Sequence, residues 1–214
     1  MAIDLQIHTI VSMPFEENTY VVLRDGAAEA LVVDPGLEPE LILDLLSRHG
    51  LTPAAILNTH GHADHIAGNE AMKRAFPAAP LVIGVHEAHL LTDANANLSA
   101  PFGMPIVSPP ADRTVAENET ITYAGIELEV REIPGHSPGH VVFVYENRLV
   151  FGGDVLFRGS VGRSDFPGGS FETLADGIRR KLYTLPDDAV IYPGHGPVTT
   201  VGHEKRTNPF VTPV

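Results

Sequence analysis

Residues 59–65 read Thr-His-Gly-His-Ala-Asp-His and begin one residue after the apolar stretch at residues 54–57, which we expect to be a buried strand. Three imidazoles and one carboxylate therefore fall within six positions. Imidazole nitrogen and carboxylate oxygen suit zinc, iron or manganese. A chain leaving a strand can direct His60 and His62 to one side and Asp64 and His65 to another, so one segment could serve two metal ions. An isolated His-x-His is more often a polar loop, but this density of ligands favours a metal site.

Three more candidate ligands follow strand-like apolar runs later in the chain. His136 lies in Pro-Gly-His-Ser-Pro-Gly-His, Asp154 in Phe-Gly-Gly-Asp, and His195 in Tyr-Pro-Gly-His-Gly. Loops at strand ends can meet on one face of a fold. The glycines and prolines beside each candidate favour tight turns that let a side chain approach an ion closely. These residues are therefore candidates for the same site as the 60–65 segment.

The ordered set of seven ligands resembles the metallo-β-lactamase superfamily, and within it the short glyoxalase II-like hydrolases. Residues 159–169, Gly-Ser-Val-Gly-Arg-Ser-Asp-Phe-Pro-Gly-Gly, add to the resemblance, which covers nearly the whole chain. It implies an α/β fold, a four-layer αββα sandwich with a binuclear metal site at one edge of the two sheets. It also implies two divalent metal ions, with zinc favoured over iron and manganese. The implied ligands are His60, His62 and His136 for one metal, Asp64, His65 and His195 for the other, and Asp154 as the bridge.

Composition narrows the class of protein. At 214 residues without a linker-like stretch, we expect a single domain over residues 1–214. The longest apolar runs are about five residues, such as 141–145, far short of the roughly 18 that suggest a membrane span. No targeting segment is visible at the N-terminus, so we expect a cytoplasmic protein without a membrane partner. The oligomeric state stays open.

Charge and cysteine content disfavour two branches of the superfamily. The net charge of −13 would repel a phosphate backbone, so we expect no nucleic-acid partner. The chain has no cysteine, whereas typical zinc β-lactamases carry a cysteine ligand where Asp154 stands here. A small-molecule substrate other than an antibiotic is favoured.

Periodicity predicts two groups of strands with helices beside them. The first group has adjacent antiparallel strands at residues 3–11, 20–23 and 30–33, then strands at 54–57 and 81–85, with helices at 39–49, 64–76 and 87–93. The second group has strands at 120–123, 126–133, 141–145 and 149–151, followed by a helix that Ser170 caps and that extends to Leu182. In the long loop at 94–113, residues 97–107, with Phe102 and Met104, are predicted to form part of a substrate-cleft wall; a surface excursion is the alternative.

The remaining polar residues are weighed one by one. His8, His49, His86, His89 and His203 lack neighbouring ligands and are not assigned to the site. His140 leads into a strand and is interpreted as a packing residue or a residue behind the ligands. Asp34, at a Pro-Gly turn, is predicted to accept the second N–H of a ligand imidazole, and turn capping is the alternative. Arg163 and Arg158 are candidate substrate contacts, and Arg163 could instead pair with Asp165.

The resemblance implies cleavage of a thioester by a metal-bridging hydroxide, with S-lactoylglutathione (a hydroxyacylglutathione) or a related small acyl thioester as substrate. Asp64 is the candidate catalytic residue, because its free oxygen could orient the water or shuttle its proton. Only 19 residues follow His195, too few for the C-terminal helical domain with which longer glyoxalase II enzymes grip glutathione. The alternative is a persulfide dioxygenase with one non-haem iron on His60, His136 and Asp154. A metal-binding protein without catalysis is a third, less favoured interpretation.

Overall fold

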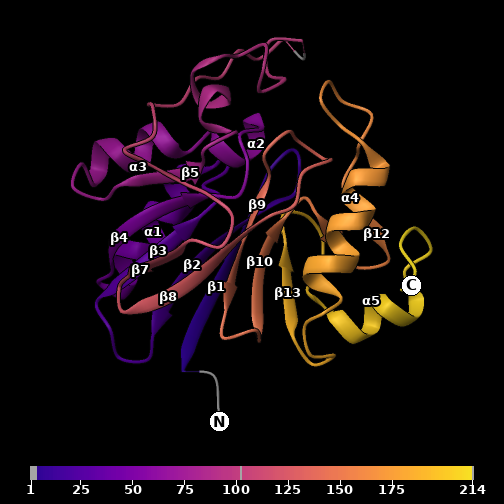
Figure 1. The fold of residues 1–214 in the computed structure, drawn as a ribbon. Coiled ribbons are helices and arrows are strands. Elements are labelled where there is room, and N and C mark those ends of the chain that lie inside the picture. Colours follow the sequence, from indigo (N-terminus) through magenta and orange to yellow (C-terminus); the bar gives the residue numbers. More distant parts are fainter. Residues whose placement is uncertain (1–3, 102, 214) are drawn as a thin grey trace.

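Two six-stranded sheets face each other in the computed structural model, which describes residues 4–101 and 103–213 (Figure 1). The first sheet has the order β1 (Leu5–Ser12), β2 (Glu17–Arg24), β3 (Glu29–Val33), β4 (Thr52–Asn58), β5 (Leu81–Gly84) and β6 (Arg113–Val115). The second has the order β14 (Thr199–Thr200), β13 (Val190–Pro193), β10 (Leu149–Gly153), β9 (Val141–Tyr145), β8 (Ile126–Glu132) and β7 (Thr120–Tyr123). A small hairpin joins β11 (Leu156–Phe157) to β12 (Ser160–Val161).

Helices cover the outer face of each sheet (Figure 1). Beside the first sheet lie α1 (Pro39–His49), α2 (Ala63–Ile66), α3 (Asn69–Ala75) and the 3-10 helix η1 (Ala88–Thr92). Beside the second lie α4 (Phe171–Gly177), its continuation as the π-helix η2 (Ile178–Leu182), and α5 (Val201–Thr207). Among the described residues no helix is long and apolar enough to span a membrane.

The alternation of side chains along β2 explains why both faces of the sheets are covered. Tyr20 and Val22 belong to the core between the sheets, together with residues of β8 and β9 such as Phe143. Val21 and Leu23 point the other way and pack with the α1 side chains Ile42 and Leu46. A strand whose successive residues are all buried needs an apolar layer on each side. A third cluster joins the second sheet to α4 and η2, which confirms the predicted four-layer αββα sandwich.

Local signals in the sequence account for several element boundaries. The three N-terminal strands are antiparallel neighbours, as predicted, although the predicted start at Ile3 lies outside the described residues. Helix α1 begins with Pro39 and stops at Gly50, whose φ of 62° is the left-handed conformation that glycine adopts without a steric cost. Ser170 caps α4 by accepting a hydrogen bond from the Thr173 N–H.

The prediction of one continuous helix over residues 64–76 is wrong. The segment 64–76 forms two short helices, α2 and α3, separated at Ala67 and Gly68. The N–H of Gly68 donates to the carbonyl of Pro35 at 2.8 Å, and a Cβ at Gly68 would lie 2.8–2.9 Å from the Pro35–Gly36 turn. This close approach to the turn that contains Asp34 accompanies the break, and periodicity alone does not reveal it. The predicted helix at 87–93 is the 3-10 helix η1.

Candidate metal centre

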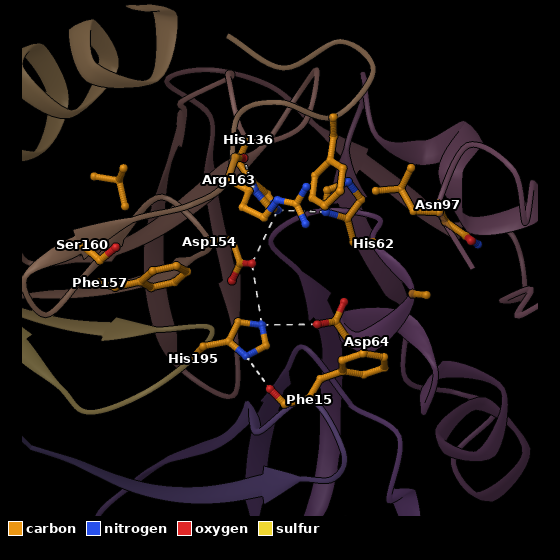
Figure 2. A pocket seen from close by; sticks show the side chains of 14 residues that line it. Phe15, His62, Asp64, Asn97, His136, Asp154, Phe157, Ser160, Arg163 and His195 are labelled. Carbon is orange, nitrogen blue, oxygen red and sulfur yellow. Dashed lines mark hydrogen bonds and ion pairs between the residues drawn. The ribbon is translucent and has the colours of Figure 1, made fainter. Parts of the chain in front are cut away.

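The seven candidate ligands come from loops of both sheets. His60, His62, Asp64 and His65 follow β4, and the side-chain amide of Asn58 at the end of β4 donates to the carbonyl of His65 at 2.9 Å. The other three belong to the second sheet: His136 lies between β8 and β9, Asp154 follows β10, and His195 follows β13. Figure 2 shows several of these side chains converging from the two halves of the fold.

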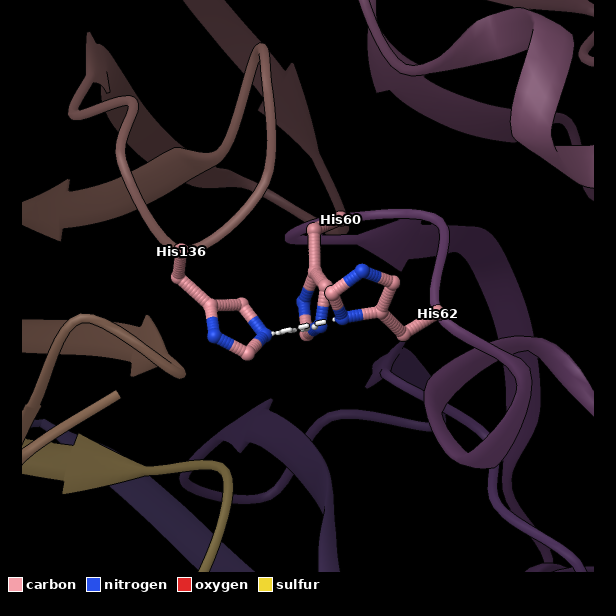
Figure 3. Close-up of side chains that lie close together, drawn as sticks. All are labelled: His60, His62 and His136. Carbon is pink, nitrogen blue, oxygen red and sulfur yellow. Dashed lines mark hydrogen bonds between the residues drawn. The ribbon is translucent and has the colours of Figure 1, made fainter. Parts of the chain in front are cut away.

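Three imidazoles, those of His60, His62 and His136, form the first ligand group, which we call the imidazole group (Figure 3). The Nε2 atom of His136 lies 2.8 Å from Nδ1 of His62 and 3.3 Å from Nε2 of His60. All three side chains are buried. Three nitrogen atoms this close, with one candidate donor atom each, can hold one cation.

Asp64, His65 and His195 form the second group, which we call the mixed group. Asp64 Oδ2 lies 3.2 Å from His195 Nε2 and 3.7 Å from His65 Nε2. Asp154 stands between the two groups: its Oδ1 is 3.4 Å from His65 Nε2, and its Oδ2 is 3.5 Å from His136 Nε2 and 3.7 Å from His195 Nε2 (Figure 2). This is the position that a bridging carboxylate needs.

Buried atoms without partners show that the residues fit metal ions. His65 Nε2 and Asp154 Oδ1 are buried polar atoms that make no hydrogen bond within the described structure. Leaving buried polar atoms unpaired costs about 1–3 kcal/mol each. A cation held by both atoms would satisfy them, and the imidazole and carboxylate donors are those that zinc, iron and manganese accept.

The second ring nitrogen of several candidate ligands lies within hydrogen-bond distance of an oxygen atom on the side away from the metal site. Nδ1 of His136 lies 2.7 Å from the carbonyl oxygen of Arg163, and Nδ1 of His195 lies 3.0 Å from that of Phe15. Each Nδ1–H donates to its carbonyl, which leaves Nε2 free as a ligand atom. Oδ2 of Asp34 lies 3.2 Å from Nδ1 of His65, where it can accept the second N–H of a ligand imidazole, as the sequence analysis predicts.

Asp34 also reaches the imidazole group through Thr59. The Thr59 hydroxyl donates to Asp34 Oδ2 at 2.7 Å and lies 3.1 Å from His60 Nδ1. Asp34 has a φ of 49°, a left-handed conformation that aspartate tolerates better than most residues. The buried ring of His140 stacks on that of His60, and its Nε2 accepts the Asp154 N–H at 3.0 Å, which agrees with its interpretation as a residue behind the ligands.

The two groups differ in their proton affinity. Burial, reinforced by neighbouring imidazoles, lowers the pKa of His60 well below its usual value and that of His62 to about 3. Burial would also lower the pKa of His65, but Asp64 and Asp154 outweigh it and raise that pKa well above its usual value. The pKa of His195 is raised in the same way, against burial, by Asp64 and Asp154. Metal-free, the rings of His60 and His62 favour the neutral form, and those of His65 and His195 favour the charged form.

Two buried glutamates near the ligands carried no recognisable signal in the sequence. The Glu87 carboxylate accepts the N–H of Gly61 at 2.8 Å and the N–H of Gly139 at 2.7 Å, so it joins the His60–His62 loop to the His136–His140 loop. Glu17 Oε1 is buried without a hydrogen-bond partner, 4.0 Å from His65 Nδ1, and burial raises the pKa of Glu17 well above its usual value. Both residues stand in ordinary polar surroundings in the sequence, and only the tertiary contacts reveal them.

A pocket of about 470 Å³ opens above the ligands. His62, Asp64, His136, Asp154 and His195 line it, whereas His60 and His65 are fully buried beneath. Arg163 lines it too, but its guanidinium makes two 2.9 Å hydrogen bonds to Asp165, the alternative foreseen from the sequence. Arg158 is exposed and is not among the described lining residues, so its contact with substrate remains a prediction without support.

The loop after η1 contributes to the pocket over a shorter range than predicted. Asn97 and Leu98 line the pocket, whereas Met104 is exposed and does not. Phe102 lies outside the described residues. The Asn97 amide donates to the carbonyls of Leu90 and Ile106, which ties the loop to η1.

Comparison with known proteins agrees with this geometry. Residues 13–195 match the metallo-β-lactamase superfamily. Hydroxyacylglutathione hydrolase GloC from Haemophilus influenzae is 36% identical over 211 residues, which cover 97% of this chain and 98% of that protein. The crystal structure of BLEG-1 B3 metallo-β-lactamase has a TM-score of 0.92 and 38% identity, covering 97% of this chain and 100% of that one. That of TTHA1623 in a di-iron-bound form has a TM-score of 0.83 and 38% identity, covering 95% and 100%.

The matched span contains all seven candidate ligands, from His60 to His195. Together with the αββα sandwich and the cluster of imidazoles and carboxylates at its edge, the match confirms the resemblance seen in the sequence. The chain belongs to the metallo-β-lactamase superfamily and is a metal-binding hydrolase of that fold.

Proposed function

We propose that the protein is a thioester hydrolase of the glyoxalase II type, with S-lactoylglutathione or a related small acyl thioester as its substrate. One observation carries the proposal: two three-ligand groups share Asp154 at the floor of a single pocket. The similarity to a hydroxyacylglutathione hydrolase over nearly the whole chain supports the choice of thioester. We propose two divalent ions, with zinc first and iron next, since a similar chain has been crystallised with two irons.

The metal ions would be held by the imidazole group, the mixed group and Asp154, and would lower the pKa of a water molecule and polarise the substrate carbonyl. Asp64 is the residue that we assign to the attacking water. Its carboxylate lines the pocket, and its Oδ2 lies 3.2 Å from Nε2 of His195, the other ligand of the mixed group that lines the pocket. From there it can orient the water and accept its proton. A thiolate leaves readily, so the pocket needs no dedicated acid beside it.

The partner and the location are proposed from the sequence. We propose a small-molecule substrate and no nucleic-acid partner, because a net charge of −13 opposes binding to a phosphate backbone. A single domain over residues 1–214 and a cytoplasmic location stay predictions from the sequence.

Two other reactions deserve a direct comparison. Persulfide dioxygenation would use one iron on His60, His136 and Asp154, whereas the proposed hydrolysis would also use the second group, Asp64, His65 and His195. β-Lactam hydrolysis is favoured by one observation, the similarity to BLEG-1, which is described as a B3 metallo-β-lactamase. The absence of cysteine therefore does not by itself exclude that activity.

Metal analysis of the purified protein, combined with turnover assays, tests the proposal. We expect about two metal ions per chain and hydrolysis of S-lactoylglutathione that a chelator abolishes. Parallel assays measure a cephalosporin and glutathione persulfide, the latter by oxygen uptake. One iron per chain with oxygen consumption would replace the proposal by the dioxygenase. Turnover of the cephalosporin alone would replace it by the lactamase.

A further inference from the structure

We infer that the pocket selects an apolar acyl group, straight-chain or aromatic and larger than lactoyl, on the thioester that it hydrolyses. The inference rests on the proposed thioester hydrolysis and adds to it the part of the substrate that the pocket recognises. It comes from the side chains that surround the ligands, not from the ligands themselves.

Three phenyl rings line the pocket beside the ligands. Phe157 stands edge-on to His195 with ring centroids 6.1 Å apart, and Phe166 stands edge-on to His62 at 5.6 Å. Phe15 is held at the same rim because its carbonyl accepts the His195 Nδ1–H (Figure 2). A thioester whose carbonyl lies at the metal ligands would place one of the groups beside that carbonyl against these rings.

Two aliphatic side chains line the pocket together with the phenyl rings. Val161 and Leu98 line the pocket on opposite segments of the chain, from β12 and from the loop after η1. Leu98 has a φ of 69°, a left-handed conformation that is unfavourable for leucine and that its surroundings must hold in place. The side-chain amide of its neighbour Asn97 makes hydrogen bonds to Leu90 and Ile106, which fix the loop. The apolar wall is therefore preformed, which reduces the entropy that binding would otherwise cost.

The charge of the pocket lining distinguishes the acyl group of the substrate from its glutathione part. Arg163 is the one basic side chain other than histidine among the described lining residues. Its guanidinium is occupied by Asp165 and lies 4.2 Å from the centre of the Phe166 ring. The tripeptide of a glutathione thioester carries two carboxylates, and the one non-histidine cation that these lining residues offer them is Arg163, which is already paired with Asp165. The tripeptide therefore faces solvent, and the acyl group meets the phenyl rings.

A series of acyl glutathiones tests this assignment with the leaving group held constant. We compare propionyl, butyryl and hexanoyl glutathione with adipoyl glutathione, which has the length of hexanoyl but ends in a carboxylate. Rates of spontaneous hydrolysis provide the correction for intrinsic reactivity. Each methylene that the pocket buries should raise kcat/KM by up to about fourfold. Adipoyl glutathione should lose the gain that hexanoyl shows over butyryl.

Two phenylalanine variants link the effect to the pocket. In Phe15→Ala and Phe166→Ala, the rise of kcat/KM with chain length should become smaller, mainly through KM, while metal content stays unchanged. Phe210→Ala is the matched control: Phe15 is 43% exposed and Phe210 52% exposed, but Phe210 does not line the pocket. The control should retain the full dependence on chain length.

The outcomes separate this inference from the proposed function. If no acyl glutathione is hydrolysed by the metal-loaded protein, both are overturned. If the series is hydrolysed but kcat/KM is flat or falls with chain length, or adipoyl equals hexanoyl, the apolar acyl site is overturned and the thioester hydrolase stands. An equal loss of chain-length dependence in Phe210→Ala would also contradict the assignment to the pocket.

Discussion

The imidazole group and the mixed group are built in the same way but differ in charge. Each takes two ligands from the 60–65 segment and one from the second sheet, His136 or His195. The imidazole group contains no carboxylate, and the pKa of His62 is lowered to about 3. In the mixed group, carboxylates raise the pKa of His65 and of His195. The comparison teaches that one loop can supply ligands of different charge to two sites. Its first two ligands, His60 and His62, are imidazoles, whereas the next one, Asp64, brings a carboxylate to the second site.

Removing the residue between the groups should have the largest effect. We expect Asp154→Ala to lose metal from both groups, because its two oxygens face His65 on one side and His136 and His195 on the other. Activity should fall by about 10⁴-fold or more, since metal ions supply several kcal/mol of transition-state stabilisation. Metal analysis and steady-state kinetics measure both quantities. Full metal content with normal turnover would remove Asp154 from the site.

Removing one ligand from one group should separate the two sites. We expect His136→Ala and His195→Ala each to retain about one metal ion and to lose roughly 10²–10³-fold in kcat. His49→Ala, an exposed histidine at the end of α1, is the control and should keep both. If either single variant loses all metal, the groups do not bind independently and the comparison between them breaks down.

Glu87 should support the imidazole group specifically. Glutamine in its place has one accepting oxygen and an amino group that only donates, so either Gly61 N–H or Gly139 N–H would face a donor. We expect Glu87→Gln to weaken metal binding at the imidazole group by about 10–100-fold, as other changes behind ligands do, and to leave the mixed group nearly unchanged. Competition with a chelator, followed for each metal equivalent, measures this.

A second buried glutamate provides the matched control for Glu87. Glu204 is also fully buried and accepts a glycine N–H, that of Gly159, together with Thr199 and Asn208. Glu204→Gln should lower the free energy of unfolding by a similar amount, about 1–3 kcal/mol, without changing metal affinity. Equal losses of metal affinity in both variants would mean that Glu87 acts only through stability.

The smallest effect concerns pH in the metal-free protein. Because the pKa of His62 is about 3 in the folded state and about 6.5 in the unfolded state, the unfolded chain binds the additional proton. The stabilising contribution is therefore present above pH 6.5 and is lost as the pH falls towards 3. The glutamine in His62→Gln does not take up this proton. Acidification should therefore lower the free energy of unfolding of the variant less steeply than that of the wild type, by up to about 1.4 kcal/mol per pH unit. Denaturant unfolding with chelator present measures the difference, and parallel curves would contradict it.

Sequence reasoning was most successful where the signal is local. The 59–65 segment predicts a metal site because its candidate ligands are close together in the sequence. The N-terminal strands and α1 are predicted by periodicity, with Pro39 and Gly50 marking the two ends of the helix. It failed at the continuous helix over 64–76, where the contact of Gly68 with Pro35 accompanies the break into α2 and α3. That contact joins residues 33 positions apart and leaves no periodic trace.

The sequence alone determined the types and order of the seven candidate ligands and the two sets of strands that carry them, because these depend on residue chemistry and short-range pattern. Only the tertiary structure decided how the two groups face each other across Asp154, that Glu87 joins two ligand loops, and that Phe15, Phe157 and Phe166 stand around the pocket. These contacts join residues that lie far apart in the chain. Their positions are set by the packing of the two sheets, which no short stretch of sequence encodes.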